Sequence, residues 1–130
     1  MAILHDINDP SDIRKLTSHE LVQLADEIRE KLIQVTSVNG GHLGPNLGVV
    51  ELTIALHSVF DIEREPLVFD VGHQGYTHKL LTGRKDKFSS LNQFGGMSRF
   101  LTRSESRHDI LDASHGGTSI PTASGMAYSN

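Results

Sequence analysis

Residues 66–71 are the single segment with the pattern of a buried β-strand, and this limits what the chain can fold into. The run is short and apolar, and proline and glycine bound it, as is typical of a strand inside a parallel sheet. Such a sheet needs several strands, because a lone buried strand leaves backbone N–H and C=O groups unpaired. We therefore expect an α/β fold in which residues 1–130 are the N-terminal part of one parallel-sheet domain, incomplete and without a second domain.

Helical patterns lie on both sides of this segment. From Thr17 to Val38 apolar residues recur every three or four positions, and Thr17 with Glu20 matches a capping box at the start of a helix. Four more helices are expected: one over residues 45–60, one over 76–81, a short one within 86–96 that is followed by a Gly-Gly turn, and one from residue 119 onward. The second of these five is apolar almost all round, so we expect it to be largely buried.

Composition excludes several classes of protein. The net charge is −4, opposite in sign to that of most non-specific nucleic-acid or anionic-membrane binders. There is no cysteine, which excludes a disulfide scaffold, a zinc ribbon and a thiol nucleophile. No apolar run is long enough to span a bilayer, and the first residues lack the pattern of a secretory signal. We expect a cytoplasmic protein that binds neither nucleic acid nor membranes.

Three of the eight histidines share a local pattern, since His42, His73 and His115 each have small residues on both sides. Glycine lets the backbone approach a ligand, and imidazole changes its charge near neutral pH. Each histidine could equally be an ordinary turn residue. A metal site built from all three is the weaker alternative, because their wide separation matches no compact ligand motif. Of the other histidines, His57 is expected to be structural, and three are expected to be exposed: His5, His19 and His108.

Three other segments have both a functional and an ordinary interpretation. Residues 116–119 could present backbone N–H groups to a phosphate, or could simply begin a helix. Residues 103–107 could hold an anionic substrate, or could belong to an exposed polar loop that spans 99–109. Asp109 and Asp112 are candidate general acids or bases.

Four blocks of this sequence resemble the 1-deoxy-D-xylulose-5-phosphate synthase family: residues 40–57, 70–84, 103–106 and 115–120. The resemblance extends over essentially the whole chain. It implies part of a thiamine-diphosphate-binding, transketolase-like domain. It also implies thiamine diphosphate and Mg²⁺ as cofactors, with pyruvate and glyceraldehyde 3-phosphate as substrates. The expected reaction joins the two with loss of CO₂, giving a precursor of isoprenoids, thiamine and pyridoxal.

The resemblance also implies roles for particular residues. His73 would contact the cofactor at the reacting centre, and His42 would face the substrate and assist proton transfer. The second cofactor-contacting stretch would be Ser114, His115 and Gly116. The metal motif of the family would follow residue 130, so this chain alone is expected to be inactive. A complementary C-terminal subunit or a homodimer is the expected partner, and a non-catalytic remnant or interaction module is the alternative.

Several residues depart from the usual pattern of the family. Gly75 and Thr77 stand where alanine and proline are usual, and Ser114 stands where glycine is usual. Two serines usually follow the third histidine, and here they are glycines, so a hydroxyl contact to the cofactor would be lost. The remaining departures are Arg99, Leu101 and Pro121.

Overall fold

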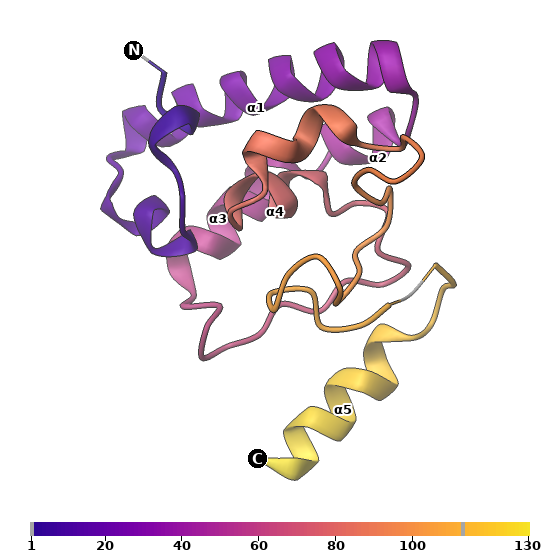
Figure 1. Ribbon diagram of the computed structural model, residues 1–130. Coiled ribbons are helices and arrows are strands. Elements are labelled where there is room, and N and C mark those ends of the chain that lie inside the picture. Colours follow the sequence, from indigo (N-terminus) through magenta and orange to yellow (C-terminus); the bar gives the residue numbers. More distant parts are fainter. Residues whose placement is uncertain (1, 113) are drawn as a thin grey trace.

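The computed structural model describes residues 2–112 and 114–130, and within them the chain is helical (Figure 1). The elements are η1 (Leu4–Asp6), η2 (Pro10–Lys15), α1 (Ser18–Asn39), α2 (Leu43–Leu47), α3 (Val50–Val59), α4 (Tyr76–Leu81), η3 (Lys85–Ser90) and α5 (Ser119–Ser129). None of the helices in this described part is long and apolar enough to cross a membrane.

The long helix α1 begins and ends where the sequence predicts. The Thr17 hydroxyl accepts from the backbone N–H of Glu20, whose carboxylate accepts in turn from the N–H of Thr17, as in a capping box. At the other end Gly40 adopts a positive φ of 76°, which favours glycine. The buried face of the helix carries Leu24, Ala25, Ile28, Leu32 and Val35.

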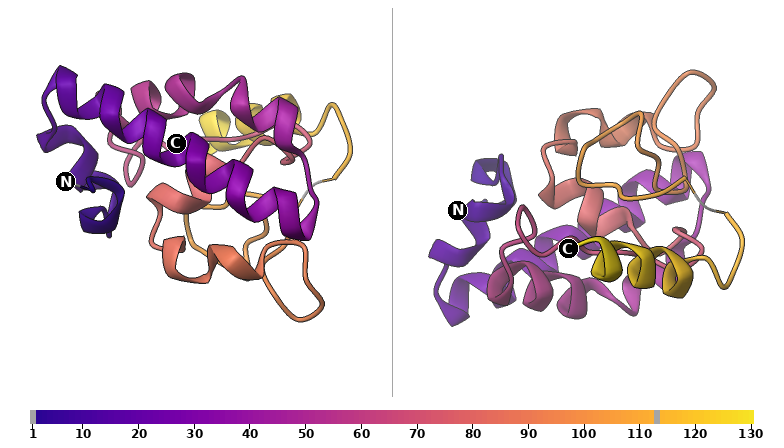
Figure 2. Two further views of the ribbon diagram at one scale, coloured as in Figure 1. Left: turned by 90° about the horizontal axis from the view of Figure 1, so that it is seen from above. Right: turned by 90° about the horizontal axis from the view of Figure 1, so that it is seen from below.

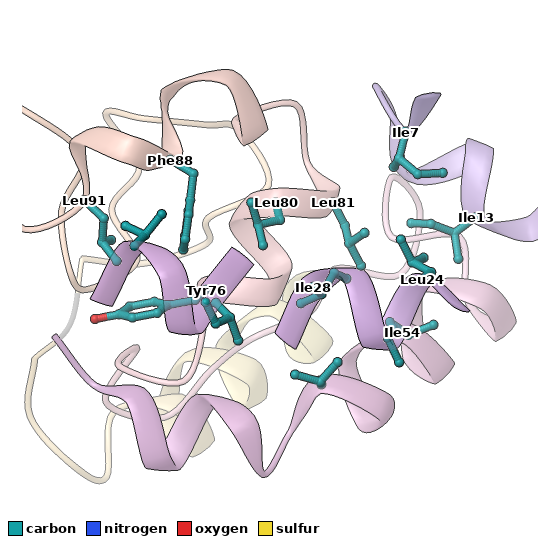
Figure 3. Packing of buried hydrophobic residues seen from close by; sticks show 14 of the residues in the cluster. Ile7, Ile13, Leu24, Ile28, Ile54, Tyr76, Leu80, Leu81, Phe88 and Leu91 are labelled. Carbon is teal, nitrogen blue, oxygen red and sulfur yellow. The ribbon is translucent and has the colours of Figure 1, made fainter. Parts of the chain in front are cut away.

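The hydrophobic core lies between α1, α3 and α4 (Figure 3). Seen from above, α1 crosses over the other helices (Figure 2). Its buried face packs on apolar residues from α3, α4 and η3, among them Ile54, Leu80 and Phe88. This core fixes the positions of the loop that follows α1 and of the N-terminus of α4, the two places from which the candidate site is built.

The expected strand over residues 66–71 is not formed, so the predicted parallel sheet is not confirmed. Among the described residues none is in a strand, and residues 67–70 run without regular secondary structure. A strand is defined by pairing with a neighbour, and within the described residues this segment has no ladder partner. One backbone hydrogen bond, from the Leu101 N–H to the Gly72 carbonyl at 3.1 Å, links the end of this segment to a later loop.

The second predicted helix is two helices, because the chain turns between α2 and α3. Val49 has φ −120° and ψ 14°, outside the α-helical region. The expectation that this stretch is largely buried is also wrong for α3. Leu52 is 58% exposed and Val59 is 72% exposed, since nothing in the described chain covers that face.

The short helix and the turn expected over 86–96 are both present, because η3 ends at Ser90 and a turn follows it. One further expectation needs correction. The loop over 99–109 is not simply exposed, because the side chains of Leu101 and Asp109 are buried. The last helix, α5, forms from Ser119 as predicted, but none of its residues is buried, and it stands apart from the other helices in Figure 1.

Candidate functional site

Two of the three glycine-flanked histidines meet in the structure. His42 lies in the loop between α1 and α2, and His73 lies in the loop that precedes α4. Their ring centroids are 5.4 Å apart and the rings are nearly perpendicular, at 79°. The ring of Phe100 lies 5.4 Å from that of His42. Two imidazoles from segments far apart in the sequence therefore share one small site.

Asn46, on α2, holds the backbone of both histidines. Its Nδ2 donates to the carbonyl oxygen of His42 at 2.6 Å and to that of His73 at 2.8 Å. Its Oδ1 accepts from the backbone N–H of Tyr76 at 2.9 Å. The side chain is fully buried, and its amide makes three hydrogen bonds to protein groups in place of water. One residue thus ties together the two histidine loops and the start of α4.

Tyr76, the first residue of α4, makes the second link to His42. Its hydroxyl accepts from the backbone N–H of His42 at 3.0 Å and lies 3.3 Å from the Nδ1 of the same residue. Figure 3 shows its ring packed in the core with the hydroxyl pointing away from the apolar cluster. A Cβ on Gly41 would lie 2.7 Å from this hydroxyl, and Gly41 has φ 123°. Glycine is therefore required beside His42.

A strained turn sets the position of His73. The Gly72 N–H donates to the Asp70 carbonyl at 2.6 Å, which closes a three-residue turn around Val71. Val71 has φ 61°, a rare and costly conformation for a β-branched residue. Beyond this turn the Nδ1 of His73 is buried and has no hydrogen-bond partner among the described residues. Buried polar atoms are normally paired, so this nitrogen is a position at which a ligand could bind.

Burial lowers the pKa of His42, and the neighbouring His73 and Arg99 lower it further. The ring is therefore neutral at pH 7. A neutral imidazole can donate a hydrogen bond from one nitrogen and accept one at the other, which suits it to move a proton.

The third histidine loop does not join the other two rings in this structure. Ser114, His115 and Gly116 are exposed. The residues that follow them bind Asp70: the Gly117 N–H donates to Oδ1 at 2.8 Å and the Ser119 hydroxyl donates to Oδ2 at 2.6 Å. The donors that the sequence offers to a phosphate are thus directed at a carboxylate, and they lower the pKa of Asp70. This contact ties the loop to the turn that leads to His73.

The residues fit an organic cofactor better than a metal ion. The unpartnered Nδ1 of His73 and the neutral ring of His42 can hydrogen-bond to an organic ligand. Within residues 2–112 and 114–130 no three His, Cys, Asp or Glu side chains are grouped so that they could hold a metal ion. The described part of the chain therefore offers two imidazoles with open hydrogen-bonding positions at this site.

A cluster of charged groups, separate from the two histidines, packs against the loop over 98–109. Arg84 makes two hydrogen bonds to the carboxylate of Asp109, each 2.7 Å long, and lies 3.2 Å from Glu105. Lys79 is fully buried and donates to Glu105 at 2.8 Å and to the carbonyl of Phe100 at 2.9 Å. Lys79 thereby holds the segment that brings Phe100 to His42.

This cluster changes the interpretation of two predicted features. Asp109, a candidate general acid or base, is a buried ion-pair partner, while Asp112 is an exposed one that faces Arg103 at 3.9 Å. The segment over 103–107 is not a uniform solvated loop, because Glu105 turns inward while Arg107 pairs with Glu63 at the surface.

His57 and His78 form a buried pair beside this cluster. His57 Nε2 and His78 Nδ1 are 3.0 Å apart, and His78 Nε2 lies 3.2 Å from the His108 carbonyl and 3.5 Å from Asp109. A carbonyl and a carboxylate only accept, so His78 Nε2 carries a proton; when His78 is neutral, its Nδ1 accepts from His57 Nε2. The structural role expected of His57 is consistent with this burial. His108 is not exposed as predicted, because its side chain is only 9% accessible.

Replacing His57 by glutamine should reduce the acid sensitivity of the fold. Burial, together with the neighbouring His78, lowers the pKa of His57 from 6.5 to about 3. Between these values the unfolded chain protonates this imidazole and the folded chain does not, so stability decreases as pH falls. The contribution is about 1.4 kcal/mol per pH unit. Glutamine keeps a donor toward His78 and does not titrate.

Urea unfolding of both proteins between pH 7 and pH 4 measures this effect. We expect a shallower pH dependence for His57→Gln by about one proton. The exposed His19→Gln is the control and should leave the slope unchanged. Equal slopes for His57→Gln and the unmodified chain would show that His57 is not kept neutral.

Two of the departures from the family pattern contact each other. A Cβ on Gly75 would lie 2.7 Å from the Leu101 Cγ, which is far inside van der Waals contact. The alanine that the resemblance leads us to expect at position 75 therefore cannot coexist with Leu101 without a shift. The two departures are compatible as a pair.

Gly75→Ala should lower the free energy of unfolding by about 1–3 kcal/mol, because it overpacks a buried contact. In a Leu101→Ala background the same change should cost less, since the clashing atoms are gone. Chemical denaturation of the two single variants and the double variant gives the coupling energy. Additive effects of the two substitutions would contradict the contact.

Asn46 and Tyr76 were not predicted as site residues from the sequence. Asn46 lies at the predicted start of one helix and Tyr76 at the predicted start of another. Tyr76 does begin α4, whereas Asn46 is the fourth residue of α2. Their partners lie 27 and 34 residues away along the chain, at His73 and His42 respectively. For Asn46 the available signal was a polar residue inside an otherwise apolar run, which suggests a buried side chain with a specific partner.

Comparison with known proteins gives a consistent result. A family model described as 1-deoxy-D-xylulose-5-phosphate synthase matches residues 4–130. A 1-deoxy-D-xylulose-5-phosphate synthase from Methylacidiphilum infernorum is 55% identical over 125 residues, covering 96% of this chain and 20% of the relative. The synthase of Rhodococcus jostii is 54% identical over 127 residues, 98% of this chain and 20% of the relative. Synthase 2 of Geobacter sulfurreducens is 56% identical over 125 residues, which cover 96% of this chain and 20% of the relative. The chain spans about a fifth of the length of these relatives.

Proposed function

Because this chain belongs to the 1-deoxy-D-xylulose-5-phosphate synthase family and corresponds to its N-terminal part, we propose that it supplies the His42–His73 portion of such an active site. The proposed reaction condenses pyruvate with glyceraldehyde 3-phosphate, with loss of CO₂. In this proposal the chain acts together with the rest of the synthase sequence, which in the relatives makes up the other four-fifths. Alone it is inactive.

One observation carries the proposal. Two imidazoles from separate glycine-rich loops lie 5.4 Å apart, and the fully bonded amide of Asn46 fixes the backbone of both. The buried Nδ1 of His73 has no partner among the described residues, so the ring is placed to contact a ligand. His57 Nδ1, in the buried His57–His78 pair, also has no partner among the described residues, so the proposal rests on the unpartnered nitrogen of His73 together with the second imidazole beside it.

The residues of this chain position the reactants and move protons. Thiamine diphosphate, when bound, supplies the nucleophilic carbon and the electron sink for decarboxylating a 2-oxo acid. His73 contacts this cofactor, and His42 faces the substrate and exchanges protons with its oxygen atoms. Phe100 packs against one side of His42, with the ring centroids 5.4 Å apart, and shields that side of the imidazole.

The second cofactor-contacting stretch is Ser114, His115 and Gly116. Its exposure leaves it free to take a ligand, and its link to Asp70 connects it with the turn that precedes His73. Mg²⁺ would be held by residues outside this chain. The complete protein would be a cytoplasmic enzyme, either a homodimer or an assembly with a complementary C-terminal subunit.

The proposal is tested by grafting this chain in place of the aligned segment of the Methylacidiphilum infernorum synthase. The graft should form 1-deoxy-D-xylulose 5-phosphate from pyruvate and glyceraldehyde 3-phosphate. His73→Ala and His42→Ala in the graft should each lower kcat by about 100-fold or more, as expected for loss of a proton-transferring group. His19→Ala, an exposed histidine on α1, is the matched control and should retain activity. A folded graft whose activity does not depend on His42 and His73 would contradict the proposal.

A further inference from the structure

We infer that Tyr76 is a positioning residue that fixes the tautomer of His42: neutral His42 carries its proton on Nε2 and presents this N–H to the ligand. The geometry of the hydroxyl supports this inference directly. Its consequence for catalysis rests on the proposed function. The ligand group that would be recognised is an oxygen acceptor, such as a carbonyl or a deprotonated hydroxyl.

The inference follows from the hydrogen atom of the Tyr76 hydroxyl. The backbone N–H of His42 can only donate, so in the 3.0 Å contact the hydroxyl oxygen is the acceptor. The hydroxyl hydrogen then needs an acceptor of its own. His42 Nδ1, 3.3 Å away, can provide it only when that nitrogen carries no proton. If Nδ1 were protonated, the hydroxyl would face two donors, and its own hydrogen would be left unpaired beside a fully buried ring.

Three features of the structure fix the position of the Tyr76 hydroxyl. The backbone N–H of Tyr76 is bound by Asn46 Oδ1 at 2.9 Å, and its ring packs edge-on against Phe88 at 6.0 Å. The absence of a side chain on Gly41 leaves the space that the hydroxyl occupies. The same oxygen contacts both the backbone and the ring of His42, so it sets the orientation of the imidazole as well as its tautomer.

The opposite nitrogen of His42 is left open. Among the described residues the structure gives Nε2 no hydrogen-bond partner, while the neighbouring His73 has an unpartnered Nδ1. A ligand between the two rings would therefore meet a donor from His42. The charged or titratable groups that face His42 are His73, Arg99 and Tyr76 itself.

The direction in which Tyr76→Phe changes the pKa of His42 tests which tautomer is present. A hydroxyl that donates to Nδ1 stabilises the neutral ring and lowers the pKa of His42, so its removal should raise that pKa by about 0.5 to 1. A hydroxyl that accepts from a protonated Nδ1 would stabilise the cation instead, and its removal should lower the pKa. The titration is followed by NMR of the ¹⁵N-labelled histidine rings. Tyr128→Phe is the control, because Tyr128 is 95% exposed on α5.

The ¹⁵N spectrum of the unmodified chain provides a measurement that needs no variant. Near pH 8 we expect the resonance of His42 Nδ1 to be that of an unprotonated nitrogen and that of Nε2 to be that of an N–H. A protonated Nδ1, or a pKa that falls or stays constant in a folded Tyr76→Phe chain, would overturn the inference. This outcome is independent of any enzymatic activity.

The catalytic consequence is read in the grafted synthase. His42→Gln keeps an N–H donor near the position of Nε2, whereas His42→Asn places its amide near the position of Nδ1. We expect His42→Gln to retain at least tenfold more of kcat than His42→Asn. Equal losses, with the expected NMR result, would show that the tautomer is fixed but that its donor is not used. A graft with no activity at all would contradict the proposed function and leave the tautomer assignment standing.

Discussion

Replacing Asn46 by leucine should lower the free energy of unfolding by about 3–5 kcal/mol. Leucine has nearly the same size but cannot hydrogen-bond. The substitution leaves three buried backbone groups without partners: the carbonyls of His42 and His73 and the N–H of Tyr76. Each unsatisfied group costs roughly 1–3 kcal/mol. Urea denaturation followed by far-UV circular dichroism measures the change.

The same substitution should also reduce catalysis, because it loosens the two histidine loops. In the grafted synthase Asn46→Leu should lower kcat by at least tenfold even where the protein stays folded, because the two imidazoles lose their common support. Gln93→Leu, a similar change at an exposed position, is the matched control and should alter stability by less than about 0.5 kcal/mol. A loss of less than about 1 kcal/mol for Asn46→Leu would show that its three hydrogen bonds do not hold the loops.

Replacing Asp109 by asparagine should destabilise the chain by about 3–5 kcal/mol at pH 7. The change preserves shape but removes the charge that pairs with the buried Arg84. Burial by itself would raise the pKa of Asp109, but hydrogen bonds from His78 and Arg84 and the charge of Arg84 lower it far below its usual range. The stabilisation is therefore fully present above about pH 4 and is lost as pH falls further, while the folded pKa is approached.

Asp112→Asn is the matched control, because Asp112 forms an exposed ion pair on the same loop on which Asp109 forms a buried one. Asp112 faces Arg103 at 3.9 Å with both side chains more than half exposed, and such pairs contribute about 0–1 kcal/mol. Thermal and urea unfolding at pH 7 should show a large loss for Asp109→Asn and almost none for Asp112→Asn. Similar losses for the two variants would mean that Asp109 is accessible to water in solution.

The local features of the fold could be predicted from the sequence because they depend on neighbouring residues. The capping box of Thr17 and Glu20 and the glycine at position 40 define α1 within a few residues of each end. The grouping of His42 with His73 was suggested by their glycine-rich surroundings. That these two share a site and His115 stands apart from them is a tertiary result, because it depends on how α2 and α4 pack.

The features that were missed depend on partners far away in the sequence. The strand expected over 66–71 has the right pattern, but pairing is a property of two segments, and the described chain provides no second one. His108 and Asp109 lie in a polar run that gives no sign of burial, and only Arg84 and His78 on the other side of the loop explain it. Asn46 shows the same limit, because its amide joins residues that no local pattern connects.

The most direct measurement of the central claim is product formation by the grafted synthase with ¹³C-labelled pyruvate. If this chain supplies the His42–His73 portion of a working site, NMR will show labelled 1-deoxy-D-xylulose 5-phosphate, formed only when glyceraldehyde 3-phosphate and thiamine diphosphate are both present. The kcat should lie within about tenfold of that of the unmodified Methylacidiphilum infernorum enzyme. A factor of ten corresponds to a change of about 1.4 kcal/mol in the activation barrier. A folded graft that binds thiamine diphosphate but forms no labelled product would contradict the claim and favour a non-catalytic remnant.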